Sequence, residues 1–524
     1  MSREMKERRK EFQRNKRLHG LEGGSRRRTE EFTPREKFIC RVGCVQVLFL
    51  GWSLGSMHVW AQFVNLGLAL VAFFGLFLPG THLLRWDRQA SGIGLLPRSG
   101  LFWLGLLFVA YVGVQCFNHS WKFQETVTEV WRPDPESPGK LVQETEDGWH
   151  IVKQDHVAWL PSSVEMPFGR MNPAASKLLV AVPIWLWACA LTMGLERRRV
   201  LRIIFWSVVL GGSAMALFGA VQRFSGTDRI FWSVVPSNPA FFGTFIYPNH
   251  AAAYLYIVLA VAVGLAFYYY SRSVRKLLRS GPHYILIFLA LILFLGLFLS
   301  KSKAGIVLGS IVVTVGLGAA LVRMLGQGSD FRQGITIGIL VVSGIGFGIY
   351  SLFNFVDVGE IFTDFETLQE GSKSPSVLQR MDLQKATWDA FIDNKWQGTG
   401  AGSFRYHFPF TQQKYSGLHF RQDYFEHAHS DYLQALMEYG IFGSLPLFLF
   451  FLLLVGRAVV ACLLRPAVHL PILAGIGVFC LHAWWDFPAQ CPSVLLTLVF
   501  VLAIMGRWGL VDASKQRINN DPVG

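Results

Sequence analysis

Long runs without any charged residue dominate this 524-residue sequence and constrain its fold more than any other feature. A helix needs about 20 apolar residues to cross the roughly 30 Å hydrocarbon layer of a bilayer. No Lys, Arg, Asp or Glu occurs from Val42 to Leu84, which is about twice that length. We therefore expect two helices in this run, joined by a turn near Ser56.

The same criterion predicts further membrane spans along the rest of the chain. They cover 99–121, 178–195, 203–222, 251–270, 280–300, 304–322, 333–356, 439–456, 466–485 and 487–506. Prolines and asparagines interrupt the uncharged run 230–250, which we expect to be an outer or re-entrant segment. Only 16% of the residues are charged, against roughly 25% in soluble proteins. The sequence therefore predicts an all-α polytopic membrane protein with about twelve transmembrane helices.

The distribution of basic residues predicts how the chain is oriented. Residues 1–41 contain 14 Lys and Arg, and loops rich in these residues stay in the cytoplasm. Twelve spans place both termini there, and every second loop is then basic, with a net charge of +20 on that side and −6 on the other. This asymmetry accounts for the overall charge of +14 without a nucleic-acid partner.

The predicted organisation has two large loops on the outer side of the membrane. The segments are a basic cytoplasmic tail (1–41), helices 1–3 (42–117), an outer loop (118–175), helices 4–9 (176–356), a second outer loop (357–438), helices 10–12 (439–507) and a cytoplasmic tail (508–524). The first loop is rich in proline and is expected to be a cap, or a lid that helps to select the substrate. The second contains an amphipathic helix at 379–393 and glycines within 395–404 that permit close backbone approach to a ligand or a tight turn.

Polar residues gather at the outer ends of several predicted spans. Titratable groups at membrane depth are costly and often mark function, although each one alone is more typical of a residue at the membrane interface. Together they indicate a site. They are Arg223 and Arg229 after the fifth span, Asn249 and His250 at the start of the sixth, Lys301 and Lys303 between the seventh and eighth, and Asp486 between the last two.

Cations at a membrane surface suit a lipid-linked diphosphate, because they neutralise it and stabilise it as a leaving group. A nearby histidine can take the proton of an incoming hydroxyl group. A metal site is the alternative, since His427 and His429, with Glu426 and Asp431 beside them, could bind zinc in an extended segment. The segment lacks a fourth ligand at suitable spacing and leads into a helix, so we predict no metal and no cofactor.

The segment that begins at His429 resembles a known signature. His429-Ser430, nine residues and then Gly440-x-x-Gly443 are similar to the motif of the O-antigen ligase family, although Ser444-Leu445 replaces the Thr-Gly that usually follows. Four further stretches, in the same order as in that superfamily, support the resemblance. They are GTFIYPNHAAAYL (243–255), SKSKAG (300–305), GTGAGSF (398–404) and HAWWDFPAQCP (482–492).

The resemblance implies a glycosyltransferase of the GT-C kind in the bacterial inner membrane. Such enzymes transfer a glycan from undecaprenyl diphosphate to an acceptor on the periplasmic face, without a nucleotide sugar or a metal. For a ligase, the acceptor is lipid A–core. The bilayer is then a partner as well.

The family histidine corresponds to His429, as the general base or the group that orients the acceptor. Lys303 follows Ser302 where family members often carry an arginine. Lys303, Lys301, Arg223, Arg229 and Arg380 are the candidates to bind the diphosphate. Asn249, His250, His427 and Asp486 are further candidates for substrate binding.

Other functions remain open at this point. An O-antigen or exopolysaccharide polymerase, or a protein O-oligosaccharyltransferase, shares the superfamily core. A transporter is the main alternative from another class, but it should show charges at mid-membrane and repeated halves. The spans are almost free of charge, and the polar residues cluster at one face, which favours surface chemistry.

Overall fold

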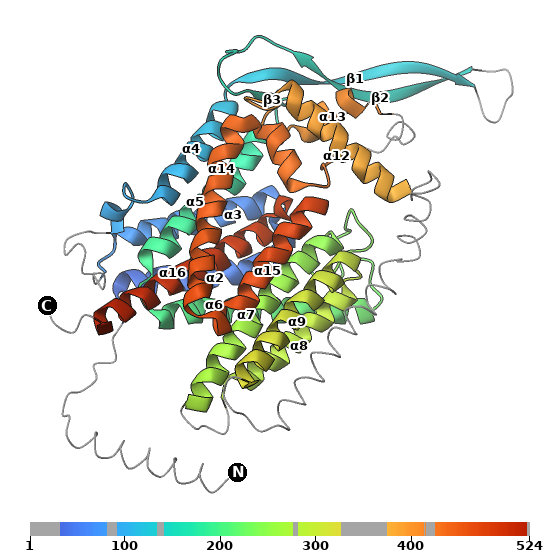
Figure 1. Cartoon of the computed structure of the whole chain (residues 1–524). Coiled ribbons are helices and arrows are strands. Elements are labelled where there is room, and N and C mark those ends of the chain that lie inside the picture. Colours follow the sequence, from blue (N-terminus) through green and yellow to red (C-terminus); the bar gives the residue numbers. More distant parts are fainter. Residues whose placement is uncertain are drawn as a thin grey trace, which may run out of the picture.

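The computed structural model describes residues 32–80, 92–133, 141–275, 281–325, 375–412, 414–415 and 425–520. Within them the chain is mostly helical (Figure 1). The helices are α2 (Pro34–Leu50), α3 (Val59–Phe74), α4 (Gly100–Gln115), α5 (Pro173–Gly194), α6 (Arg198–Phe224), α7 (Pro248–Arg275), α8 (His283–Leu299), α9 (Lys303–Leu325), α12 (Pro375–Asp393), α13 (Phe404–Gln412), α14 (Asp431–Leu464), α15 (Pro466–Trp485) and α16 (Pro492–Asn520).

Eight helices in the described part of the chain are long and apolar enough to cross a membrane, and α4 and α8 are shorter apolar helices. Every predicted span in the described residues overlaps a helix, although the span predicted at 99–121 extends beyond α4 and the one at 487–506 begins before α16. The predicted turn near Ser56 is the 3₁₀ turn η1 (Leu54–Ser56). The predicted span 333–356 lies outside the described residues. The total of twelve spans and their orientation therefore remain predictions.

Several helices extend beyond the bounds that the charge pattern predicts. Helix α2 begins within the segment expected to be a tail, α14 begins before the span predicted at 439, and α16 continues into the segment expected to be the C-terminal tail. A charged residue ends an apolar run but does not end a helix, whose backbone hydrogen bonds are independent of side-chain polarity. Six helices begin at a proline, whose fixed φ suits the first helical turn. They are α2, α5, α7, α12, α15 and α16.

The expectation of an all-α chain is wrong in the first outer loop, which contains a sheet. Strand β1 (His119–Pro133) pairs antiparallel with β2 (Leu141–Lys153), and the short β3 (Ser163–Glu165) runs parallel to β1. The predicted boundary of this loop at 175 also falls inside α5, which begins at Pro173. The sheet lies across one end of the helical bundle, near α12 and α13 (Figure 1).

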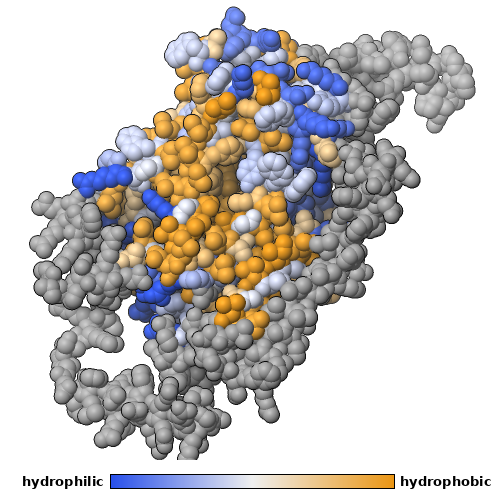
Figure 2. All heavy atoms as spheres, in the orientation of Figure 1, coloured by the Kyte–Doolittle hydropathy of each residue, from blue (hydrophilic) through white to orange (hydrophobic). Residues whose placement is uncertain are grey.

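Helices α7 and α16 form the centre of the bundle. Helix α7 packs on α8, α9 and α15, while α16 packs on α5 and α14. Figure 2 shows hydrophobic residues gathered over the middle of the visible face and hydrophilic residues mainly toward its ends. This distribution is the one expected of helices that face lipid.

Charged residues gather at the end of the bundle opposite the sheet. Glu36 of α2 pairs with Arg197 and accepts hydrogen bonds from the backbone N–H groups of Glu196 and Arg197, at 2.9 and 2.8 Å. Asp512 of α16 pairs with both Arg198 and Arg465. Two of the loops predicted to be cytoplasmic, one with Arg197 and Arg198 and one with Arg465, are thus joined to α2 and α16 at this end, because buried carboxylates pair with their arginines.

Candidate functional site

Four segments that are far apart in the sequence meet at the sheet end of the bundle. They are the start of α7, the turn between α8 and α9, the start of α14 and the connection between α15 and α16, which contains the 3₁₀ turn η5 (Pro488–Gln490). We call this region the site end. It contains the predicted residues Asn249, His250, His427, His429 and Asp486.

Asp486 is the hub of the site end. Its Oδ1 lies 3.4 Å from Nδ1 of His429, and its Oδ2 lies 3.4 Å from Nε2 of His482, one helical turn earlier. Asn249 donates a hydrogen bond of 2.5 Å to the same Oδ2. The carboxylate is buried, so these contacts replace the water that it loses.

The partners of Asp486 determine its ionisation. Burial alone would raise the pKa of this carboxyl group, but the contacts with His429 and His482 outweigh burial and hold its pKa well below the usual range. Asp486 is therefore a carboxylate at neutral pH. A carboxylate on Nδ1 of His429 favours the tautomer that has its proton on Nδ1 and leaves Nε2 as an acceptor.

Local backbone structure presents His429 to this hub. His429 has φ of 48°, in the left-handed region that few residues other than glycine adopt. Ser430 then caps α14, and its side chain accepts a hydrogen bond from the backbone N–H of Leu433. The side chain of Gln384, on α12, donates to the carbonyl of His429 at 3.1 Å. The cap at Ser430 and the hydrogen bond from Gln384 therefore stabilise the strained backbone of His429.

Phe487 separates the histidines of the site end. The ring of His427 lies 4.5 Å from that of Phe487, and His429 and His250 contact it edge-on at 5.0 and 5.4 Å. Burial, followed by the charges of Lys177 and His250, lowers the pKa of His427 well below its usual range. The side chain of His429 is 28% exposed, whereas His250 and His482 are buried. His429 is thus the imidazole of the site end that combines solvent access with a carboxylate partner.

A second chain of polar contacts was not foreseen from the sequence. Lys177, near the start of α5, donates to Gln490, whose side chain in turn donates to Asp431 at 3.1 Å. The backbone N–H of Ala489 also donates to Asp431, at 2.8 Å. These contacts fix the start of α14 against η5 and place a further cation near His427. Lys177 lies outside every motif, but its position at the outer end of a predicted span was a usable signal.

Ser302 connects the Asp486 hub to the two lysines predicted to bind phosphate. Its hydroxyl donates to the side-chain oxygen of Asn249 at 2.7 Å, and it accepts from the backbone N–H of Gly305 at 3.0 Å. Lys301 and Lys303 flank this buried serine, and both are exposed. Their ammonium groups are therefore carried by the same turn that contacts the hub.

The three candidate arginines lie outside the contacts of the hub in the described residues. Arg223 is half-buried in the last turn of α6, Arg229 is exposed and 3.9 Å from the exposed Asp228, and Arg380 is exposed on α12. Among the described residues, no contact of Asp486 involves these arginines. The structure therefore joins Asn249, His429 and Asp486, but it does not bring Arg223, Arg229 or Arg380 into that network.

The glycines of the second outer loop approach another part of the backbone closely. Gly440 kinks α14 with φ of 59°, and a Cβ atom there would lie 2.5 Å from the backbone of Gly398 and Trp396. The N–H groups of Thr399 and Gly400 donate to carbonyls of α14 at 2.8 and 2.9 Å. This contact explains the first glycine of the Gly440-x-x-Gly443 motif. A Cβ atom on the second would lie 2.5 Å from the ring of Tyr111.

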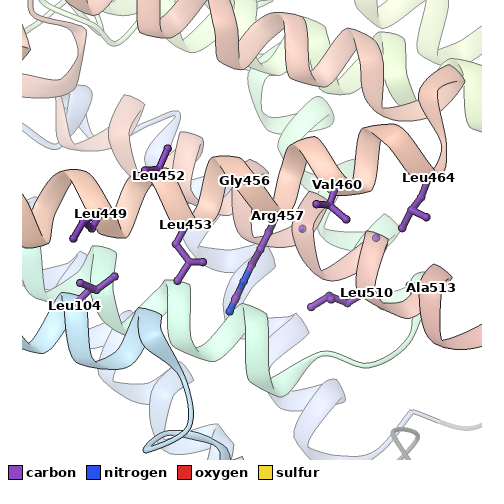
Figure 3. A pocket seen from close by; sticks show the side chains of 12 residues that line it. Leu104, Leu449, Leu452, Leu453, Gly456, Arg457, Val460, Leu464, Leu510 and Ala513 are labelled. Atoms are coloured by element: carbon purple, nitrogen blue, oxygen red, sulfur yellow. The ribbon is translucent and has the colours of Figure 1, made fainter.

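One apolar pocket lies away from the site end. It is an apolar crevice of about 660 Å³ between α4, α14 and α16, lined mainly by leucines. Figure 3 shows Arg457 extending from α14 between Leu453 and Leu510. Its lining of leucines suits lipid chains rather than a polar substrate.

The described residues contain no group of three or more His, Cys, Asp and Glu side chains that could hold a metal ion. His427 and His429 both pack on Phe487 instead. Independence from metal remains a prediction.

Comparison with known proteins finds a family resemblance for part of the chain. A search of curated proteins found no match. Residues 240–451 match the family model described as O-antigen ligase. The matched segment includes Asn249, Ser302, the glycines of the second outer loop, and His429 with its Gly440-x-x-Gly443 motif, and it ends before Asp486. Residues 240–451 of this multi-helical chain are therefore similar to the O-antigen ligase family.

Proposed function

We propose that this protein is a membrane glycosyltransferase of the O-antigen ligase type. It transfers a glycan from undecaprenyl diphosphate to lipid A–core or a related acceptor, on the periplasmic face of the bacterial inner membrane. The observation that carries the proposal is the contact between the partly exposed His429, which lies in the segment that matches the O-antigen ligase family, and the buried Asp486, which follows that segment.

In the proposed reaction, an acceptor hydroxyl group attacks the anomeric carbon of the donor glycan. Its oxygen forms the new glycosidic bond, and its proton passes to Nε2 of His429. The bond between the anomeric carbon and the diphosphate oxygen breaks, and the diphosphate leaves with the electron pair. Asp486 orients His429 and stabilises the imidazolium that forms, as the carboxylate of a catalytic triad does.

The departing diphosphate needs positive charge nearby. Lys303 and Lys301 are the strongest candidates, because the buried Ser302 between them contacts Asn249, which contacts Asp486. Arg223, Arg229 and Arg380 are further candidates, and the structure adds Lys177. A lysine supplies charge without the bidentate geometry of arginine, so several are expected to act together. We propose that these cations make metal unnecessary.

The glycan profile of a deletion strain tests the proposal and separates ligase from polymerase. A ligase deletion should lose all long glycan on lipid A–core, and wild-type protein should restore it. A single retained repeat unit would favour the polymerase. An unchanged profile in a strain that makes the glycan would contradict both activities.

The requirement for metal is tested on the purified protein. Transfer should continue in EDTA, because the basic residues neutralise the diphosphate. Loss of transfer on chelation, restored by zinc or magnesium, would favour the metal site at His427 and His429.

A further inference from the structure

An aromatic cleft lies beside His429 and is separate from the Asp486 hub. It has a volume of about 590 Å³ and is formed by α12, Tyr415, the start of α14 and the end of α15. Its size falls in the range of small-molecule sites, roughly 300–1,000 Å³. The lining residues are Met381, Gln384, Lys385, Trp388, Asp389, Tyr415, Leu433 and Trp485.

The cleft combines flat aromatic surfaces with hydrogen-bonding groups. Trp388 and Trp485 approach it from different helices and remain 47% and 54% exposed. The hydroxyl of Tyr415 donates to Asp389 at 2.5 Å, and this bond raises the pKa of Tyr415 to about 12. The tyrosine therefore stays protonated, and its oxygen and the second oxygen of Asp389 can accept hydrogen bonds.

This composition distinguishes the cleft from an ordinary belt of interfacial tryptophans. A lipid chain would meet the carboxylate of Asp389 and the ammonium of Lys385, which are costly neighbours for hydrocarbon. A sugar ring has C–H groups that pack on the negative face of an indole, and hydroxyl groups that pair with polar side chains. A saccharide fits both surfaces.

Gln384 joins the cleft to the candidate catalytic histidine. It lines the cleft, and its side-chain N–H₂ donates to the carbonyl of His429 at 3.1 Å and toward that of Trp484 at 3.4 Å. A ligand in the cleft therefore lies beside the residue that also fixes the backbone of His429.

We propose that this cleft is a saccharide-binding subsite that holds sugar units of the glycan substrate next to His429. The inference rests on the proposed function. Donor and acceptor both contain sugars, and the cleft's chemistry suits either. Trp388 and Trp485 provide the stacking surfaces, while Asp389 and Gln384 bind hydroxyl groups.

Saccharide binding to the full-length protein in nanodiscs tests the proposal. The two probes are the oligosaccharide repeat released from the cell's lipid-linked donor by mild acid, and the delipidated core oligosaccharide of the acceptor. At least one should bind wild-type protein. Trp388→Ala and Trp485→Ala should each raise its Kd roughly fivefold to tenfold, by loss of one stacking surface. The probe that binds identifies the source of the sugar.

Trp484→Ala is the matched control for Trp485→Ala. Trp484 is adjacent in sequence and 50% exposed, but it packs near Tyr432 and does not line the cleft. The Kd of Trp484→Ala for the saccharide probe should stay within twofold of the wild-type value. Because Trp388 and Trp485 lie on different helices, failure of one variant to fold leaves the other as the test.

Two results would overturn the subsite: neither probe binds wild-type protein, or the two tryptophan variants bind as tightly as wild type. Binding with the predicted tryptophan dependence, but no glycan transfer by wild-type protein, would contradict the proposed function and leave the subsite supported.

Discussion

Two residues from other parts of the chain orient His429. Asp486 contacts Nδ1 of the His429 ring, and the side chain of Gln384 donates a hydrogen bond to the backbone carbonyl of His429. The other side of the ring is left for an acceptor hydroxyl, since the side chain is partly exposed. A general base requires this combination of fixed orientation and access.

Replacement of Asp486 by Asn should reduce stability in a way that depends on pH. The folded-state pKa of Asp486 lies below its unfolded value of about 3.9, so its carboxylate stabilises the fold above that pH and loses this effect as pH falls further. Asp486→Asn should cost about 1.5–3 kcal/mol at pH 7, as for a hydrogen-bonded charged group. Thermal unfolding in detergent at pH 7, 5, 4 and 3 should show a difference in unfolding temperature between wild type and variant that narrows only below about pH 4.

Asp393→Asn is the control for that series, because Asp393 is 61% exposed in a surface pair with Lys414. Its unfolding temperature should differ little from wild type at every pH. If the difference in unfolding temperature between wild type and Asp486→Asn widens toward pH 4, Asp486 is not stabilised as a carboxylate.

Lys303→Ala should raise the apparent KM for the lipid-diphosphate donor roughly tenfold to a hundredfold, because a charge-assisted contact with phosphate is lost. Lys303→Arg should retain most activity, since the charge remains. Initial rates across donor concentrations measure both. Lys414→Ala, at an exposed surface pair, serves as the control, and wild-type kinetics for Lys303→Ala would remove Lys303 from the diphosphate site.

Sequence patterns predicted individual residues of the candidate site, but they did not predict which of these residues contact each other. His429 followed from its motif, and Asp486 from its place between two spans. Their contact depends on how α14 and α15 pack, which neither signal contains. His482 was missed as a partner, although its spacing of four residues from Asp486 puts the two on one helical face.

At the scale of elements, the kink of α14 at Gly440 joins this helix to the second outer loop. The first part of the helix turns at Gly440, and the backbone of residues 395–400 fills the kink through hydrogen bonds to both sides. Gly398 therefore approaches α14 closely, whereas Cβ atoms at Gly400 and Gly402 would meet Ser162–Ser163 and Pro173. The loop and the helix form one unit that supports the site.

Gly440→Ala should destabilise the protein by about 1–3 kcal/mol or more, because alanine is strained at this positive φ and its Cβ would clash with Gly398 and Trp396. Gly456→Ala, on the same helix, has no atom within 4 Å of its new Cβ and should be neutral or stabilising by about 0.5–1 kcal/mol. Thermal unfolding of both variants in detergent is the measurement. Equal unfolding temperatures would show that the kink does not depend on glycine.

Helices were predicted well and strands were not, for a physical reason. A membrane helix leaves a long apolar run that can be counted directly. Strands β1 and β2 carry charges and alternate weakly, and prolines surround them, so their segment resembled an irregular loop. Their pairing depends on contacts between distant residues, which a local pattern does not record.

The whole molecule has two chemically different ends. One carries the Asp486 hub, the sheet and the aromatic cleft, and the other carries Arg197, Arg198 and Arg465, which pair with buried carboxylates. The charge rule assigns the second end to the cytoplasm. The proposed mechanism requires the first end to face the periplasm.

Cysteine labelling tests this orientation. In a protein with its seven native cysteines replaced, Asp393→Cys should react with a membrane-impermeant maleimide added from the periplasmic side. Arg272→Cys should react only after the inner membrane is permeabilised. Both positions are exposed. The reverse pattern would put the site on the cytoplasmic face, away from the proposed donor.

The central claim is tested most directly by single-turnover glycan transfer in nanodiscs, with lipid-diphosphate donor and purified acceptor. His429→Ala should transfer at least about 100-fold more slowly than wild type, as expected for loss of a general base, while its unfolding temperature and donor binding stay near wild type. His156→Ala, at an exposed histidine that contacts its own loop, should transfer normally. Transfer by a well-folded His429→Ala within twofold of wild type would contradict the account.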